Sequence, residues 1–150
     1  MHRLASIWVV LLTASACGAG RTDVHTVSGD TLFTGTIAYF LYWSFSEPAA
    51  SGLSVEIHQE PGGCFQTSVP GAGAVLRVSI GTAETSLGPG KFEGNAYYDK
   101  SPRQLSSVSS HVELDHLSST DAQGTIDVTL NDETRLQGEF LAAPCPQGPP

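Results

Sequence analysis

Apolar and polar residues alternate one by one in several short runs of this 150-residue sequence. Consecutive side chains of a β-strand point to opposite faces of a sheet, so such a run predicts a strand with one face in a core and the other in water. No stretch shows convincing helical periodicity, which disfavours a parallel α/β fold. The alternating runs are Leu53–Ile57, Leu76–Ile80, Phe92–Tyr98, Val108–Leu114, Ile126–Leu130 and Leu136–Ala142.

Turn-forming residues separate these runs. Pro and Gly stand between them at residues 61–63, 70–73 and 88–90, and Asn131–Thr134 joins the last two runs as the clearest hairpin. The charged fraction of 15% also favours strands and turns over long solvated helices. We therefore expect an all-β domain after an N-terminal signal helix: an antiparallel β-sandwich, or a partly open barrel, of about seven to eight strands.

Residues 1–16 are expected to form a signal peptide. Arg3 supplies a positive charge, and Leu4–Ala14 is an apolar run of eleven residues. A helix of that length spans about 16 Å, well short of the roughly 30 Å hydrocarbon core of a bilayer. The run therefore predicts an export signal rather than a membrane span.

The sequence LTASAC at residues 12–17 resembles the lipobox of bacterial lipoproteins. The resemblance implies that Cys17 is lipidated, becomes the mature N-terminus and anchors the protein to a membrane of the cell envelope, on its periplasmic or surface side. Ala14 stands where the family usually has Leu. Residues 14–16 also fit the Ala-x-Ala rule of ordinary signal peptidase, which would give a soluble exported protein. An uncleaved anchor is the third alternative.

Three cysteines, Cys17, Cys64 and Cys145, occur in the chain. An exported protein with an odd number of cysteines has one thiol left to explain, and lipidation of Cys17 would explain it. We predict that Cys64 and Cys145 form a disulfide in an oxidising compartment, because both have turn-forming neighbours typical of loops. The alternative is that both are small buried apolar residues.

The mature chain divides into three expected parts. Residues 17–30 are predicted to be the lipidated cysteine and a flexible tether, because they are small, polar and aperiodic. Residues 31–145 are the β-domain, and the Pro-rich residues 146–150 are a tail.

The last hairpin resembles the closing segment of predicted β-sandwich lipoproteins of bacteria. That segment ends in Gly-x-Phe, a small residue and a cysteine, which correspond here to Gly138, Phe140, Ala142 and Cys145. The resemblance implies architecture and location, and no active site.

His111, Glu113 and Asp115 alternate along one predicted strand, with His116 beside them and His58 on another strand. Imidazole and carboxylate groups are metal ligands, but side chains two apart on a flat strand lie nearly 7 Å from each other. A solvated outer face, which the alternation already predicts, is the preferred interpretation. We therefore expect no metal and no cofactor.

The aromatic stretch Phe33–Phe45 supplies the best candidate for a ligand site. We expect its odd-numbered residues, among them Leu41 and Trp43, to face the core. Phe40 and Tyr42 would then lie on the solvent side, either under a loop or in an exposed patch that binds a sugar or a protein.

The function that these observations favour is an envelope-anchored, non-enzymatic binding or structural module. No Gly-x-Ser-x-Gly motif occurs, and the histidines have no recognisable catalytic setting. The net charge of −8 argues against nucleic acid as a partner. The membrane, through the N-terminal lipid, is the expected partner, together with an unidentified protein or carbohydrate. The alternative is a soluble secreted or periplasmic enzyme with an unrecognised site.

Overall fold

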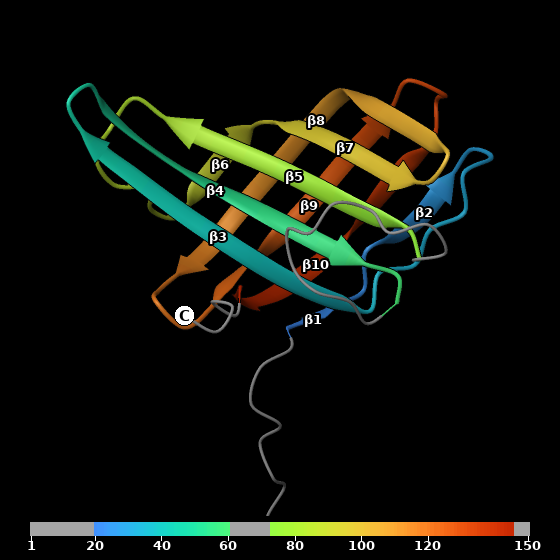
Figure 1. Ribbon diagram of the computed structural model, residues 1–150, viewed down its shortest axis with the longest axis horizontal. Coiled ribbons are helices and arrows are strands. Elements are labelled where there is room, and N and C mark those ends of the chain that lie inside the picture. Colours follow the sequence, from blue (N-terminus) through green and yellow to red (C-terminus); the bar gives the residue numbers. More distant parts are fainter. Residues whose placement is uncertain (1–19, 61–72, 146–150) are drawn as a thin grey trace, which may run out of the picture.

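The computed structural model describes residues 20–60 and 73–145, and all regular structure in these ranges is β-strand (Figure 1). The expected signal peptide, Cys17, Cys64 and the tail of residues 146–150 lie outside the described residues. Within the described ranges, no helix is long and apolar enough to cross a membrane. The strands are β1 (Arg21–Thr22), β2 (His25–Ser28), β3 (Ile37–Ser46), β4 (Ala49–His58), β5 (Val75–Thr82), β6 (Gly90–Glu93), β7 (Asn95–Lys100), β8 (Arg103–Leu117), β9 (Ala122–Leu130) and β10 (Arg135–Pro144).

Seven strands, β3, β4, β5, β7, β8, β9 and β10, form a closed barrel. Neighbouring strands pair antiparallel except at the closure, where Ala143 of β10 lies parallel to Tyr39 of β3. The Cys145 N–H also donates to the Phe40 carbonyl at 3.0 Å. The all-β prediction is confirmed, but the barrel is closed and mixed rather than an antiparallel sandwich or a partly open barrel. Alternation shows which face of a strand is buried, and it does not show which two strands meet to close a sheet.

Apolar side chains from the inward faces of the strands fill the barrel. The inward residues of the alternating runs in β4, β5 and β9 are buried as expected. Val108, expected on the core face of its run, is exposed instead. The register of β8 against β9 shifts between Ser107 and Ser109, so Val108 is the extra residue of a β-bulge. The largest fully buried apolar side chains are Phe140, Leu53, Ile57, Leu76, Leu114, Leu130 and Leu136.

The segment before residue 31 belongs to the fold, so the prediction of a flexible tether is wrong for residues 20–30. The strands β1 and β2 both pair antiparallel with β10, and Val24 between them is fully buried. Gly138 of β10 has a φ of 152°, and a Cβ there would lie 2.6 Å from the Val24 Cα. A glycine in β10 therefore makes room for the incoming chain, a pairing that composition does not reveal.

The long strand β8 has two different neighbours along the same edge. Its first part pairs with β7 in the barrel, whereas residues 111–114 pair with the short extra strand β6. Gly94 separates β6 from β7, and its N–H donates to the Ser110 carbonyl at 2.9 Å. The strand β6 thereby widens the sheet formed by β8, β9 and β10, which carries the site described next.

Candidate functional site

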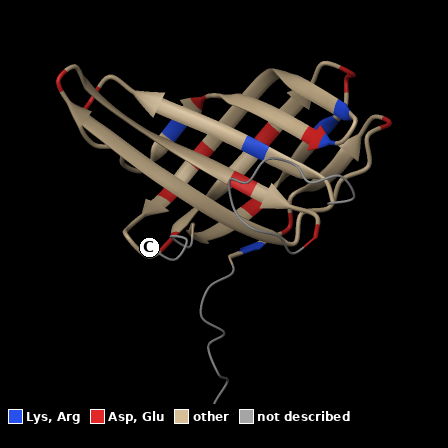
Figure 2. Ribbon diagram, in the orientation of Figure 1, with Lys and Arg blue, Asp and Glu red and all other residues tan. Residues whose placement is uncertain are grey.

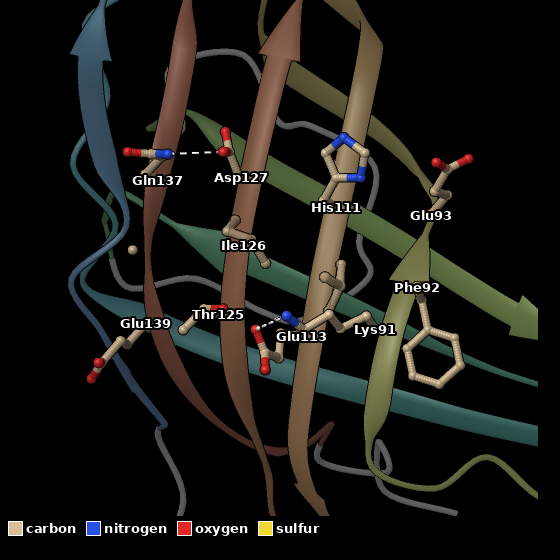
Figure 3. Close-up of a pocket in the computed structure, with 12 residues that line it drawn as sticks. Lys91, Phe92, Glu93, His111, Glu113, Thr125, Ile126, Asp127, Gln137 and Glu139 are labelled. Atoms are coloured by element: carbon tan, nitrogen blue, oxygen red, sulfur yellow. Dashed lines mark hydrogen bonds and ion pairs between the residues drawn. The ribbon is translucent and has the colours of Figure 1, made fainter.

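A trough of polar side chains lies on the outer face of β6, β8, β9 and β10 (Figure 3), with an open volume of about 750 Å³. Strand register places these side chains in two parallel rows across the four strands. We call this surface the polar trough. Its first row is Glu93, His111, Asp127 and Gln137, and its second row is Lys91, Glu113, Thr125 and Glu139.

Asp127 is the most strongly held side chain of the polar trough. Its carboxylate accepts hydrogen bonds from the Arg135 Nε at 2.9 Å and from the Gln137 Nε2 at 2.8 Å. The Arg135 guanidinium, and to a smaller extent the Gln137 amide, lower the pKa of Asp127 below its usual value. Asp127 is therefore a fixed negative charge at neutral pH.

The second row is more loosely held and has two carboxylates and one ammonium group. Lys91 Nζ lies 3.6 Å from the Glu113 carboxylate, and both side chains are solvent-exposed. An exposed pair of this kind contributes little to stability, so the two groups can turn towards a ligand. Four carboxylates line the polar trough against one ammonium group. The surface therefore favours neutral or cationic ligands over anionic ones.

The structure does not bring the candidate metal ligands together. His111 and Glu113 face the polar trough, as a solvated outer face predicts, whereas Asp115 lines a separate hollow beside Arg21. His116 pairs with Asp121, and its Nε2 lies 3.1 Å from the Asp121 carboxylate. Among the described residues, no three His, Cys, Asp or Glu side chains are placed to hold a metal ion.

Phe40 and Tyr42 line one hollow between β3 and the ends of β8 and β10, but they differ in burial, and ligand binding there stays a prediction. Phe40 is only 5% exposed and packs in the core, which corrects the prediction, whereas Tyr42 at the far end of β3 is 38% exposed. The odd-numbered face expected in the core is instead solvent-exposed at Leu41, Trp43 and Phe45. Both faces of β3 are apolar, so its own alternation could not distinguish them.

The β3–β4 hairpin contained a signal that identifies the inward face of β3. Directly opposite residues of two paired strands lie on the same face of the sheet. Val55 alternates clearly with polar neighbours, and the register places Phe40 opposite it. Counting back from the turn at Glu47 and Pro48 would therefore have placed Phe40 in the core.

A buried polar cluster on the outer face of β4 was missed by the sequence reasoning, apart from His58. Glu56 is buried, and its carboxylate lies 3.1 Å from the His58 Nε2 and 3.4 Å from the Arg77 Nη2. The Tyr39 ring packs edge-on against the His58 ring, with centroids 5.7 Å apart. Buried charges need partners, so this cluster holds β3, β4 and β5 in one arrangement.

Cys145 is the one cysteine among the described residues. The pairing of Cys64 with Cys145 therefore stays a prediction.

No family model, curated protein or solved structure matches this chain. The polar trough and the exposed face of β3 therefore have to be interpreted from their own chemistry. The resemblance of residues 12–17 to a lipobox likewise stays a prediction.

Proposed function

We propose that this protein is a lipid-anchored binding domain of the bacterial cell envelope, without enzymatic activity. The location is supported by the apolar run Leu4–Ala14 and by the small residues before Cys17. Two or three acyl chains on Cys17 would hold the protein on a membrane almost irreversibly, whereas one chain gives only marginal binding.

The polar trough is the observation that carries the binding role. Its side chains come from four hydrogen-bonded strands, so the strand register fixes the points from which they project before any ligand arrives. Rows of carboxylate, amide, hydroxyl and imidazole groups suit a ligand with many hydrogen-bonding groups. The acidic lining restricts that ligand to a neutral or cationic component of the envelope, such as a glycan or a basic peptide segment.

The protonation state of Asp127 supports a binding role for this residue rather than a role as a general acid. A general acid that works near neutral pH needs a carboxyl group with a raised pKa. The pKa of Asp127 is lowered instead, first by its hydrogen bond with Arg135. Asp127 is therefore suited to hold a ligand and not to protonate one.

NMR spectroscopy of the unlipidated Cys17→Ser chain tests the binding role with two probes, an N-acetylglucosamine tetramer and a lysine-rich peptide. We expect at least one probe to shift the amide signals of Thr125, Asp127 and Gln137. Glu113→Gln removes a charge and keeps the hydrogen-bonding groups, so it should weaken the peptide response and spare the glycan response. Glu84→Gln, on the exposed loop after β5, is the matched control. Shifts centred elsewhere, or none with either probe, would contradict the assignment.

Metabolic labelling with radioactive palmitate tests the anchor independently. Wild-type protein should carry label and partition with membranes, and Cys17→Ser should lose both. The variant then remains as an uncleaved precursor or, if ordinary signal peptidase cuts after Ala16, as a soluble protein. Unchanged size, label and membrane partition in Cys17→Ser would show that Cys17 is not the anchor.

A further inference from the structure

The outer face of β3 carries an exposed apolar row. Leu41, Trp43 and Phe45 are 44%, 37% and 61% exposed, and Tyr42 is exposed at the same end of the strand. None of the ten residues of β3 is charged, so the strand appears without red or blue in Figure 2. We call Leu41, Trp43 and Phe45 the apolar row.

The aromatic side chains of the apolar row are held in place by packing against the sheet and against each other. Trp43 lies over two glycines, Gly52 of β4 and Gly81 of β5, which are its neighbours across the sheet. A Cβ at Gly52 would overlap the Trp43 ring. The Phe45 ring packs beside Trp43 with centroids 5.6 Å apart. The indole is thus held against the sheet with its other face open.

The length of chain before the fold limits how far the domain can be from an anchor on Cys17. The Gly20 carbonyl accepts a hydrogen bond from the Ala38 N–H at 3.4 Å, so the chain is already part of the sheet at residue 20. Cys17 is three residue steps before Gly20. They span at most about 11 Å when fully extended. An acylated Cys17 therefore keeps the barrel in contact with the membrane surface.

Two outer surfaces lie near the anchor, and their chemistry decides which of them meets the membrane. Gly20 lies beside Ala38, near the start of β3, and the apolar row begins three residues later on the same strand. The polar trough also approaches this end of the chain, because β10 pairs with β3 and Asp23 exchanges hydrogen bonds with the backbone of Glu139. Its acidic lining would be repelled by anionic headgroups, whereas Trp and other aromatic side chains favour the bilayer interface.

We infer that the apolar row, and not the polar trough, rests on the lipid bilayer that holds the Cys17 anchor. This inference rests on the proposed lipid anchor. The partner is a lipid surface recognised through its apolar and interfacial regions and not through headgroup charge, because β3 has no cationic side chain. High salt should therefore leave the contact unchanged.

The fluorescence of Trp43 can report whether the apolar row contacts the membrane. The chain has two tryptophans, Trp8 and Trp43, and Trp8 is lost when the signal peptide is removed before Cys17. In the lipidated protein reconstituted into phosphatidylcholine vesicles, we expect lipids brominated on their upper acyl carbons to quench Trp43. Aqueous iodide should quench it less than in an unlipidated Cys17→Ser chain that begins at residue 17 and so also lacks Trp8.

Phe45→Ser and Leu41→Ser should each reduce quenching by brominated lipid and increase quenching by iodide, because each removes apolar area from the contact. The unlipidated chain should bind vesicles weakly, and Phe45→Ser should weaken that binding by roughly tenfold. Val108→Ser is the matched control, since Val108 is an exposed apolar residue on β8, away from the row. It should change neither measurement.

Vesicle flotation separates failure of this inference from failure of the proposed anchor. Protein that does not float shows that the anchor is absent. If the protein floats but Trp43 is quenched by iodide and not by brominated lipid, the inference is wrong and the proposed lipid anchor is still supported. If the Cys17→Ser chain forms a dimer in which Trp43 is shielded, and vesicles do not change that shielding, the row binds a second copy of the chain and the inference is wrong.

Discussion

The outer face of β3 and the outer face of β8, β9 and β10 belong to one barrel and carry opposite chemistry. The first has no charged residue and exposes aromatic side chains. The second carries carboxylates and hydrogen-bonding side chains, with the Lys91 ammonium group on the adjoining β6. Figure 2 shows acidic residues in red on these strands. The inner faces of the same strands are mostly apolar, with Ser110 of β8 as a buried polar exception.

Folding constrains the inner faces of the strands more strongly than their exposed outer faces. Every strand of a closed barrel must bury one face, so the inner surfaces are alike. The exposed parts of the outer surfaces are not fixed by core packing, and an apolar side chain there loses no core contact when it is changed. An exposed cluster of large apolar residues on one side therefore indicates what that side of the molecule meets.

The largest predicted effect compares the two faces of β3 itself. Phe40→Ala removes a buried ring from the core and should lower the free energy of unfolding by about 3–5 kcal/mol. Phe45→Ala, on the exposed face of the same strand, should cost less than about 1 kcal/mol. Urea denaturation of the unlipidated chain measures both. Equal losses would mean that the inward and outward faces of β3 are wrongly assigned.

An intermediate effect is expected where the apolar row meets the sheet. Gly52→Ala places a methyl group where the Trp43 ring now lies and 2.8 Å from the Ile80 carbonyl oxygen. The ring must lift, so stability should fall by about 1–3 kcal/mol, and Trp43 emission should shift to longer wavelength.

Gly88→Ala is the control for this substitution, because a Cβ at Gly88 meets no atom within 4 Å. It should leave both stability and emission unchanged. If Gly52→Ala does the same, Trp43 does not rest on the glycines, and the apolar row is not a fixed surface.

Residue pattern predicted most of the interior of the barrel. Strict alternation in β4, β5 and β9 identified their core residues, and the turn at Asn131–Thr134 identified the hairpin of β9 and β10. It failed for β3, where both faces are apolar and only pairing with β4 decides the inward side. It also failed at Val108, because a bulge adds one residue and reverses the faces that follow.

The closure and the polar trough could not be predicted from pattern, because both depend on contacts between distant segments. The closure uses Ala143 and Pro144, which have no distinctive periodicity. His111 and Glu113 were recognised as a polar face, but their grouping with Asp127 and Glu139 requires the register of three strands. A sequence that matches no known family gives no other source for that register.

The smallest predicted effect lies in the polar trough. Asp127 is ionised in the folded protein to lower pH than in the unfolded chain, because Arg135 donates to it. Its stabilising contribution is therefore present above the unfolded pKa of about 3.9 and is lost as the pH falls through the lowered folded value.

Asp127→Asn should lower the free energy of unfolding by less than about 1 kcal/mol at pH 7, as expected for an exposed ion pair. This difference in the free energy of unfolding between the wild type and Asp127→Asn should disappear in strong acid. Urea denaturation midpoints at a series of acidic pH values measure it. Glu84→Gln removes an exposed carboxyl group on a loop and should not change the free energy of unfolding at pH 7 or in strong acid. A deficit in Asp127→Asn that persists in acid would mean that Asp127 acts through packing, and the polar trough would then lack the fixed charge that makes it unlike β3.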